Sequence, residues 1–142
     1  LALVRWPLLW AVLISVGGIE SRKNTLRLLD AFMALRARRP NAQWVIAGGA
    51  SLLNHDDYVA AFIERIAHSG LTIGPGRDIV LTGTVADAHM PALYRSADVL
   101  AMPSLCEGFG LVVLEALACG TPTVVSAIAP FTEHLSDTDC CW

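Results

Sequence analysis

Residues 98–120 read DVLAMPSLCEGFGLVVLEALACG and contain a strand, a loop and a helix in succession. The short apolar run Val99–Met102 predicts a strand that is buried on both faces. The glycine-rich loop Pro103–Gly110 follows it, and the apolar segment 110–119 predicts a helix. Gly120 suits the left-handed position that closes such a helix. The stretch therefore indicates the strand-loop-helix unit from which parallel sheets are built.

The same alternation runs through the rest of the chain. Four more short apolar runs predict strands, at Ala11–Val16, Gln43–Ala47, Ile79–Thr82 and Thr123–Ser126. Three more helices are predicted between them: one from Asn24 that stops before Pro40, one from Val59 that ends at Gly70, and one that Asp87 caps and that reaches Ala97. Strict alternation predicts an α/β fold with a doubly wound, Rossmann-like parallel sheet.

The composition is that of one folded domain. The chain has 142 residues, 54% hydrophobic and 16% charged, which excludes a disordered protein. Its net charge of −3 argues against nucleic acid as a partner.

The apolar run Trp6–Val16 is shorter than the roughly 20 residues of a membrane span, so its second half is assigned to the first strand. Cysteines 106, 119, 140 and 141 lack metal-ligand spacing, which favours reduced thiols and a cytoplasmic protein.

Ligands of doubly wound sheets lie beyond the carboxyl ends of the strands, so the loops there are the candidate sites. The first loop contains Gly17 and Gly18, which let a ligand approach the backbone, and then Arg22 and Lys23 just before a predicted helix. Helix N-termini attract anions, and two cations beside one predict a phosphate site. The alternative is an ordinary solvated cationic turn.

The loop after Met102 carries two carboxylates. Glu107 precedes the helix, and Glu115 lies within its apolar run. We expect Glu115 to be buried and hydrogen-bonded to a ligand hydroxyl, because an unpaired buried carboxylate is costly. Eight residues of helix span about 12 Å, which suits a ligand with a sugar at each end of a diphosphate. The alternative is an exposed helix position that happens to be charged.

These motifs resemble those of a known enzyme family. Glu107-Gly-Phe-Gly-Leu-Val-Val-Leu-Glu115, followed by Ala116–Val124, resembles the Glu-x7-Glu signature of the family 4 (group 1) retaining glycosyltransferases. Tyr94–Val99 and Val16–Asn24 also resemble that family, and the similarity extends from Ile14 to Glu133. It implies that residues 1–142 are a single nucleotide-sugar-binding domain, the C-terminal half of a two-domain GT-B glycosyltransferase whose N-terminal acceptor-binding domain is absent.

The resemblance implies a role for each matching residue. Lys23 and Arg22 would neutralise the donor diphosphate and Glu107 would bind the donor sugar, which makes these three the implied catalytic residues. The other implied donor contacts are Gly17 and Gly18, the backbone of Phe109, Gly110 and Leu111, the ribose-binding Glu115, and Gly83, Thr84 and Val85 beside the base. No metal and no cofactor other than the nucleoside-diphosphate sugar is implied.

The sequence also departs from the family. Many relatives carry arginine where Gly18 stands, so a phosphate contact is either missing or supplied by Arg22. We expect Glu133 to cap a helix and the pair Gly48-Gly49 only to turn the chain. The four histidines are expected to be structural or on the surface.

Transfer of a hexose, with retention, from a nucleoside-diphosphate sugar is the function that the motifs favour, with the isolated chain expected to be inactive. Two alternatives stay open: a nucleotide-binding or interaction module without activity, and a sugar-nucleotide epimerase or phosphorylase of the same fold. The expected partners are the donor and the missing acceptor domain. Peripheral contact of the full-length protein with the inner face of a membrane is also left open.

Overall fold

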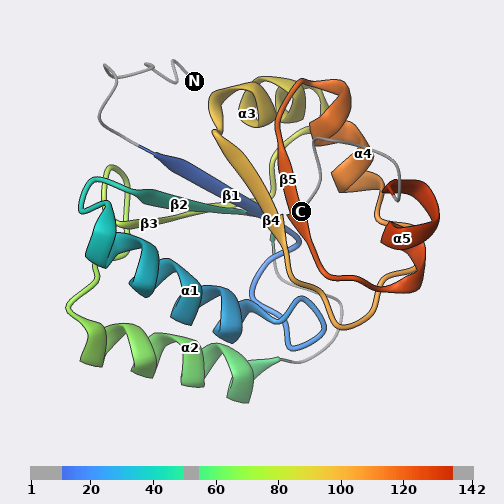
Figure 1. The fold of residues 1–142 in the computed structure, drawn as a ribbon. Coiled ribbons are helices and arrows are strands. Elements are labelled where there is room, and N and C mark those ends of the chain that lie inside the picture. Colours follow the sequence, from blue (N-terminus) through green and yellow to red (C-terminus); the bar gives the residue numbers. More distant parts are fainter. Residues whose placement is uncertain (1–10, 50–54, 136–142) are drawn as a thin grey trace.

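The computed structural model describes residues 11–49 and 55–135, which form a five-stranded parallel sheet between two layers of helices (Figure 1). The strand order is β3-β2-β1-β4-β5. The strands are β1 (Val12–Val16), β2 (Gln43–Ala47), β3 (Ile79–Gly83), β4 (Val99–Met102) and β5 (Thr123–Val125). The predicted doubly wound sheet is therefore confirmed.

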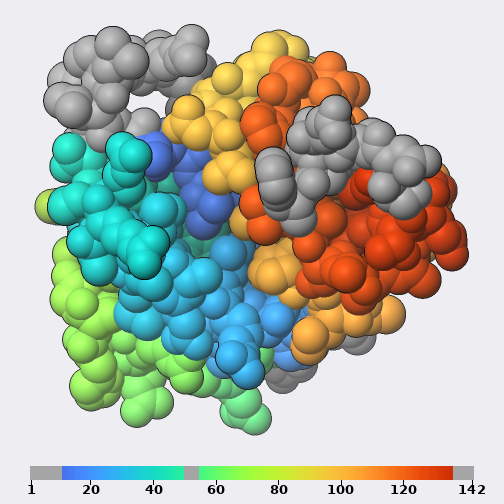
Figure 2. Space-filling model, viewed as in Figure 1, coloured from blue at the N-terminus to red at the C-terminus, as the bar shows by residue number. Residues whose placement is uncertain are grey.

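Helices cover both faces of the sheet. On one side lie α1 (Thr25–Arg38) and α2 (Asp56–Ser69), and on the other lie α3 (Met90–Ser96), α4 (Leu111–Ala118) and α5 (Ala129–Leu135), with the short 3-10 helix η1 (Asp87–His89) leading into α3 (Figure 1). In the same view of the surface, α1 (blue) lies between α2 (green) and the segments toward the C-terminus (orange and red) (Figure 2).

Alternate residues of the inner strands β2, β1 and β4 belong to two separate cores. Leu13 packs with residues of α1 and α2, while its neighbour Ile14 packs with residues of α3, α4 and α5. The first core centres on Trp44, whose ring centroid lies 5.7 Å from that of Phe32 and 5.8 Å from that of Phe62. Burial on both faces explains why these strands are continuous apolar runs.

The element boundaries differ from expectation in a few places. Asn24 precedes α1 as predicted, but it has a left-handed backbone (φ 57°) and its side chain makes no capping hydrogen bond. Asp87 begins η1 and does not cap the following helix by its side chain. The helix α5 was not predicted, and Glu133 lies within it, so the expectation that Glu133 caps a helix was wrong.

Within residues 11–49 and 55–135, no helix is both long and apolar enough to cross a membrane. The assignment of Ala11–Val16 to a buried strand is confirmed, because Leu13, Ile14 and Ser15 are buried in β1. Cys106 and Cys119 are free thiols. Cys140 and Cys141 lie outside the described residues.

Candidate functional site

The loops that follow β1 and β4 meet where the connectivity of the sheet reverses. β1 leads through α1 to β2 on one side, whereas β4 leads through α4 to β5 on the other. Loops diverge at such a point and leave a crevice, which is where ligands of doubly wound sheets bind. The two loops are joined by a backbone hydrogen bond of 2.8 Å from the Leu105 N–H to the Arg22 carbonyl. The predicted cationic loop and the predicted carboxylate loop therefore form one site.

Glu107 is the centre of this site. Its Oε1 accepts hydrogen bonds from Lys23 Nζ at 2.6 Å and from Ser104 Oγ at 2.8 Å, and its Oε2 pairs with Arg22 at 3.0 Å. The Glu107 side chain is only 8% exposed and that of Lys23 12%, while Arg22 is 44% exposed. Arg22 also pairs with the buried carboxylate of Glu20 at 3.3 Å. The structure thus brings all three implied catalytic residues together.

The surroundings of Glu107 keep it ionised. Burial raises its pKa, but the hydrogen bonds from Lys23 and Ser104, together with the charges of Lys23 and Arg22, lower it by more. The pKa therefore lies below the ordinary value of 4.5. The cluster of Glu20, Arg22, Lys23 and Glu107 thus pairs two cations with two carboxylates, so its formal charges balance.

This lowered pKa predicts a pH dependence of stability. A carboxylate with a depressed folded-state pKa stabilises the fold above its unfolded pKa, and that contribution is lost as the pH falls through the folded value. We expect the free energy of unfolding to decrease below about pH 5, and to decrease less steeply in Glu107→Gln. Urea unfolding between pH 7 and pH 3 measures both slopes. Parallel slopes in the two proteins would show that Glu107 is not held by these cations.

Glycines allow the loops after β1, β2 and β3 to pack closely against one another beside the site. Gly17 has a φ of +114°, and a Cβ there would lie 2.7 Å from Cε of Lys23, so the lysine side chain crosses over this glycine. Gly18 has a φ of +77°, and a Cβ there would lie 2.8 Å from the Gly49 carbonyl oxygen. A Cβ on Gly49 would in turn collide with the Thr84 hydroxyl. Gly48-Gly49 therefore does more than turn the chain, because it holds the loops after β1, β2 and β3 together.

Glu115 differs from expectation. It is an exposed residue of α4, so the prediction of a buried carboxylate was wrong. Its hydroxyl partner belongs to the protein, since Tyr94 Oη donates to Glu115 Oε2 at 2.8 Å. Burial, reinforced by this hydrogen bond and by the charge of Glu115, raises the pKa of Tyr94, so the phenol stays protonated. Tyr94 thereby orients the carboxylate at the surface.

The turn into α4 is apolar and exposed. Gly110 precedes the helix with a φ of +80°, and Phe109 and Leu111 on either side of it are 49% and 60% exposed. Gly83 (φ +65°), the last residue of β3, and Thr84 are exposed at the carboxyl end of the sheet, and Val85 is half-buried. The implied donor-binding residues of these two loops thus lie at the carboxyl end of the sheet.

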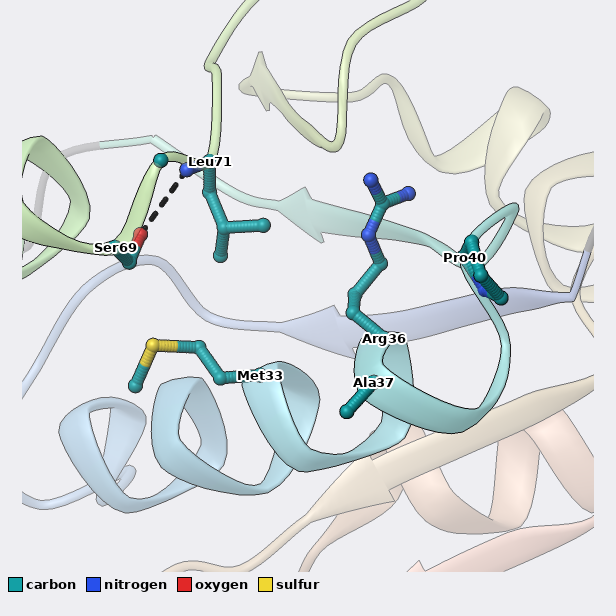
Figure 3. Close-up of a pocket in the computed structure, with 7 residues that line it drawn as sticks. Met33, Arg36, Ala37, Pro40, Ser69 and Leu71 are labelled. Carbon is teal, nitrogen blue, oxygen red and sulfur yellow. Dashed lines mark hydrogen bonds between the residues drawn. The ribbon is translucent and has the colours of Figure 1, made fainter.

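Outside this site, the described residues form a hollow near the ends of two helices but no cluster that could hold a metal ion. The described residues contain no group of three His, Cys, Asp or Glu side chains that could hold a metal ion. The sequence Asp-Thr-Asp at 137–139 also offers carboxylates, which are common metal ligands, but it lies outside the described residues. A hollow between the ends of α1 and α2 is lined by Met33, Arg36, Ala37, Pro40, Ser69, Gly70 and Leu71 (Figure 3). Its charged group, Arg36, is already held by Asp78 at 2.6 Å and by the Ala42 carbonyl at 2.8 Å, so it is structural.

Comparison with known proteins shows the family of this chain. Residues 10–140 match the family described as glycosyl transferases group 1. The chain belongs to this family. It is 38% identical over 132 residues to the GDP-mannose-dependent α-(1-6)-phosphatidylinositol dimannoside mannosyltransferase of Mycobacterium tuberculosis, covering 92% of this chain and 31% of the relative. It is 39% identical over 132 residues to the D-inositol 3-phosphate glycosyltransferase of Salinispora tropica, covering 89% and 26%.

Solved structures place this group 1 chain among the GT-B glycosyltransferases. The Anabaena protein HepE, crystallised with UDP and glucose, superposes with a TM-score of 0.72 at 28% identity, covering 86% of this chain and 31% of HepE. The C-terminal domain of a group 1 family protein from Francisella tularensis superposes with a TM-score of 0.68 at 27% identity, covering 80% and 57%. This group 1 chain spans about a quarter to a third of the length of the curated relatives it matches.

Sequence reasoning missed three residues of the candidate site. Ser104 binds Glu107 from three residues earlier in the same loop, a spacing that could have indicated a turn hydrogen bond. Glu20 lies two residues before Arg22 and pairs with it, so the opposite charges at this short spacing could also have indicated the contact. Tyr94 in α3 binds Glu115 in α4, which lies 21 residues later in the chain. No local sequence pattern points to that pair.

Proposed function

We propose that this chain binds the donor of a retaining glycosyltransferase, which moves a hexose from a nucleoside-diphosphate sugar to an acceptor. The observation that carries the proposal is the contact of Lys23 and Arg22 with Glu107 at the point where the sheet reverses. It sets two cations and one carboxylate side by side where a ligand of this fold binds. Cations suit a diphosphate, and a carboxylate suits sugar hydroxyls.

The same residues account for the chemistry of transfer. As the sugar leaves, negative charge develops on the diphosphate, and fixed cations lower the energy of that state. Lys23 has three N–H donors and Arg22 has five, so both can bind phosphate oxygens while they still hold Glu107. We assign the neutralisation of the leaving group to these two side chains, without a metal ion.

The relatives support a nucleotide-sugar donor without fixing its base. HepE was crystallised with UDP and glucose, whereas the mycobacterial relative depends on GDP-mannose. In this chain the base would lie near Gly83, Thr84 and Val85, and the ribose near Glu115. The exposure of Glu115, with Tyr94 behind it, leaves the carboxylate at the surface for a ligand to reach.

A binding screen tests the proposal. The melting temperature of the chain is measured separately with UDP, GDP and ADP, and with a hexose derivative of each. A ligand at about 100 times its Kd adds roughly 2.7 kcal/mol to the free energy of unfolding, so one base series should raise the melting temperature clearly. No shift with any of these compounds would contradict the proposal.

The two carboxylates should act on different parts of the donor. We expect Glu115→Gln to weaken binding of the nucleoside diphosphate, and Glu107→Gln to weaken mainly the additional affinity that the sugar provides. The reason is that Glu107 contacts the cations Lys23 and Arg22, whereas Glu115 lies in α4 and contacts Tyr94. Calorimetric titration of each variant with nucleoside diphosphate and with sugar nucleotide separates the two effects. Equal losses for the plain nucleoside diphosphate would show that the roles are assigned wrongly.

A further inference from the structure

Helix α5 supports the turn that carries Glu107. The Phe131 side chain, which is 2% exposed, lies so close to Gly110 that a Cβ on this glycine would collide with the ring. Leu135, 8% exposed, belongs to the same core as Phe131. The helix is therefore fixed to the body of the domain at both residues, and its position sets that of the turn.

His134 extends this contact to the exposed side of the turn. It lies three residues after Phe131, a spacing that places two side chains on the same side of a helix. The ring centroids of His134 and Phe109 are 4.6 Å apart and their planes are inclined by 51°. His134 is itself exposed, and Phe109 is 49% exposed, so this ring contact fills no core. Its effect is to restrict where the Phe109 ring can lie.

We propose that His134 is a positioning residue for the donor sugar, which it affects by holding Phe109 and thereby the turn from Glu107 to Gly110. The inference rests on the proposed function. Phe109 is two residues from Glu107, so a Phe109 ring that moves freely loosens the backbone that aims this carboxylate. Loss of His134 therefore reduces the contribution of the sugar to donor affinity, while Lys23 and Arg22 still bind the diphosphate.

Calorimetry with two matched pairs of probes, UDP with UDP-glucose and GDP with GDP-mannose, tests this role. For the pair that binds the unmodified chain, His134→Ala should lower the affinity for the sugar nucleotide by roughly 2- to 12-fold, the range of an aromatic pair. The affinity for the plain nucleoside diphosphate should stay the same. His134→Phe keeps an aromatic ring and should restore the lost affinity. His68→Ala, an exposed histidine on α2 at the opposite face of the sheet, is the control and should change neither.

A double-mutant cycle completes the test. In a Phe109→Ala background, His134→Ala should have no further effect, because its partner ring is gone. Equal affinities of the unmodified chain and His134→Ala for the sugar nucleotide would overturn the role of His134 and leave the proposed function standing. A parallel loss for nucleotide and sugar nucleotide would also overturn it, since that indicates a general loss of structure. Failure of the unmodified chain to bind any of these four probes, and also ADP and its hexose derivative, would overturn both proposals.

Discussion

Replacing Lys23 with alanine is expected to weaken nucleoside-diphosphate binding by about 1.5–3 kcal/mol, or roughly 10- to 150-fold, the range for hydrogen bonds to charged groups. The Lys23 side chain is only 12% exposed and touches Glu107 at 2.6 Å, so its charge is held in place at the site. Affinity for the nucleoside without phosphates should hardly change. Calorimetry with the diphosphate and the nucleoside measures the two effects.

Two controls make the Lys23 result specific. Lys23→Arg keeps the charge and should retain most of the affinity, while Arg27→Ala removes an exposed cation of α1 and should have little effect. Because Lys23 is the only lysine of the chain, acetylation of lysine should reproduce the loss without mutagenesis. Equal weakening of nucleoside and diphosphate by Lys23→Ala would indicate that the residue is structural.

The second large effect concerns transfer itself. We expect these 142 residues alone to bind the donor and to transfer no sugar to an acceptor. All the donor contacts that we propose lie between residues 17 and 115, and the chain spans about a quarter to a third of its relatives. Holding two reactants together supplies much of the rate of a two-substrate reaction, and we assign no acceptor-binding residue here.

The test for transfer incubates the chain with a labelled sugar nucleotide and a broad panel of acceptors. Slow hydrolysis of the donor by water is compatible with our account. Acceptor-dependent formation of glycoside at about 1 per second or faster, which is typical of enzymes, would contradict it. A chain that binds the donor but transfers no sugar could be the donor-binding part of a transferase or a module that only binds nucleotides. Transfer activity that is regained on adding the N-terminal half of a relative would indicate the former.

Most of the fold could be predicted because the strands are buried on both faces. Val99–Met102 and Gln43–Ala47 were predicted with the bounds that the structure shows, since each is an apolar run between polar breaks. The helix α5 was missed because it is short and lies near the end of the chain. Pro130 at its second position is a signal for a helix start that could have revealed it.

The site was harder to predict because it depends on strand order. Lys23 and Glu107 are 84 residues apart, and they meet because β1 pairs with β4. Nothing local in the sequence specifies that pairing.

The wrong prediction for Glu115 has a different cause. Almost every residue of α4 is apolar, so the sequence does not show which side of this helix faces solvent.

Mapping the bound nucleotide onto the chain tests the central claim most directly. Backbone amide NMR shifts are followed while the nucleoside diphosphate that binds best is added. Our account predicts the largest changes in residues 17–24 and 103–111, with smaller ones at 83–85. Shifts confined to the hollow around Met33, Arg36 and Leu71 (Figure 3), or spread without a centre, would contradict it.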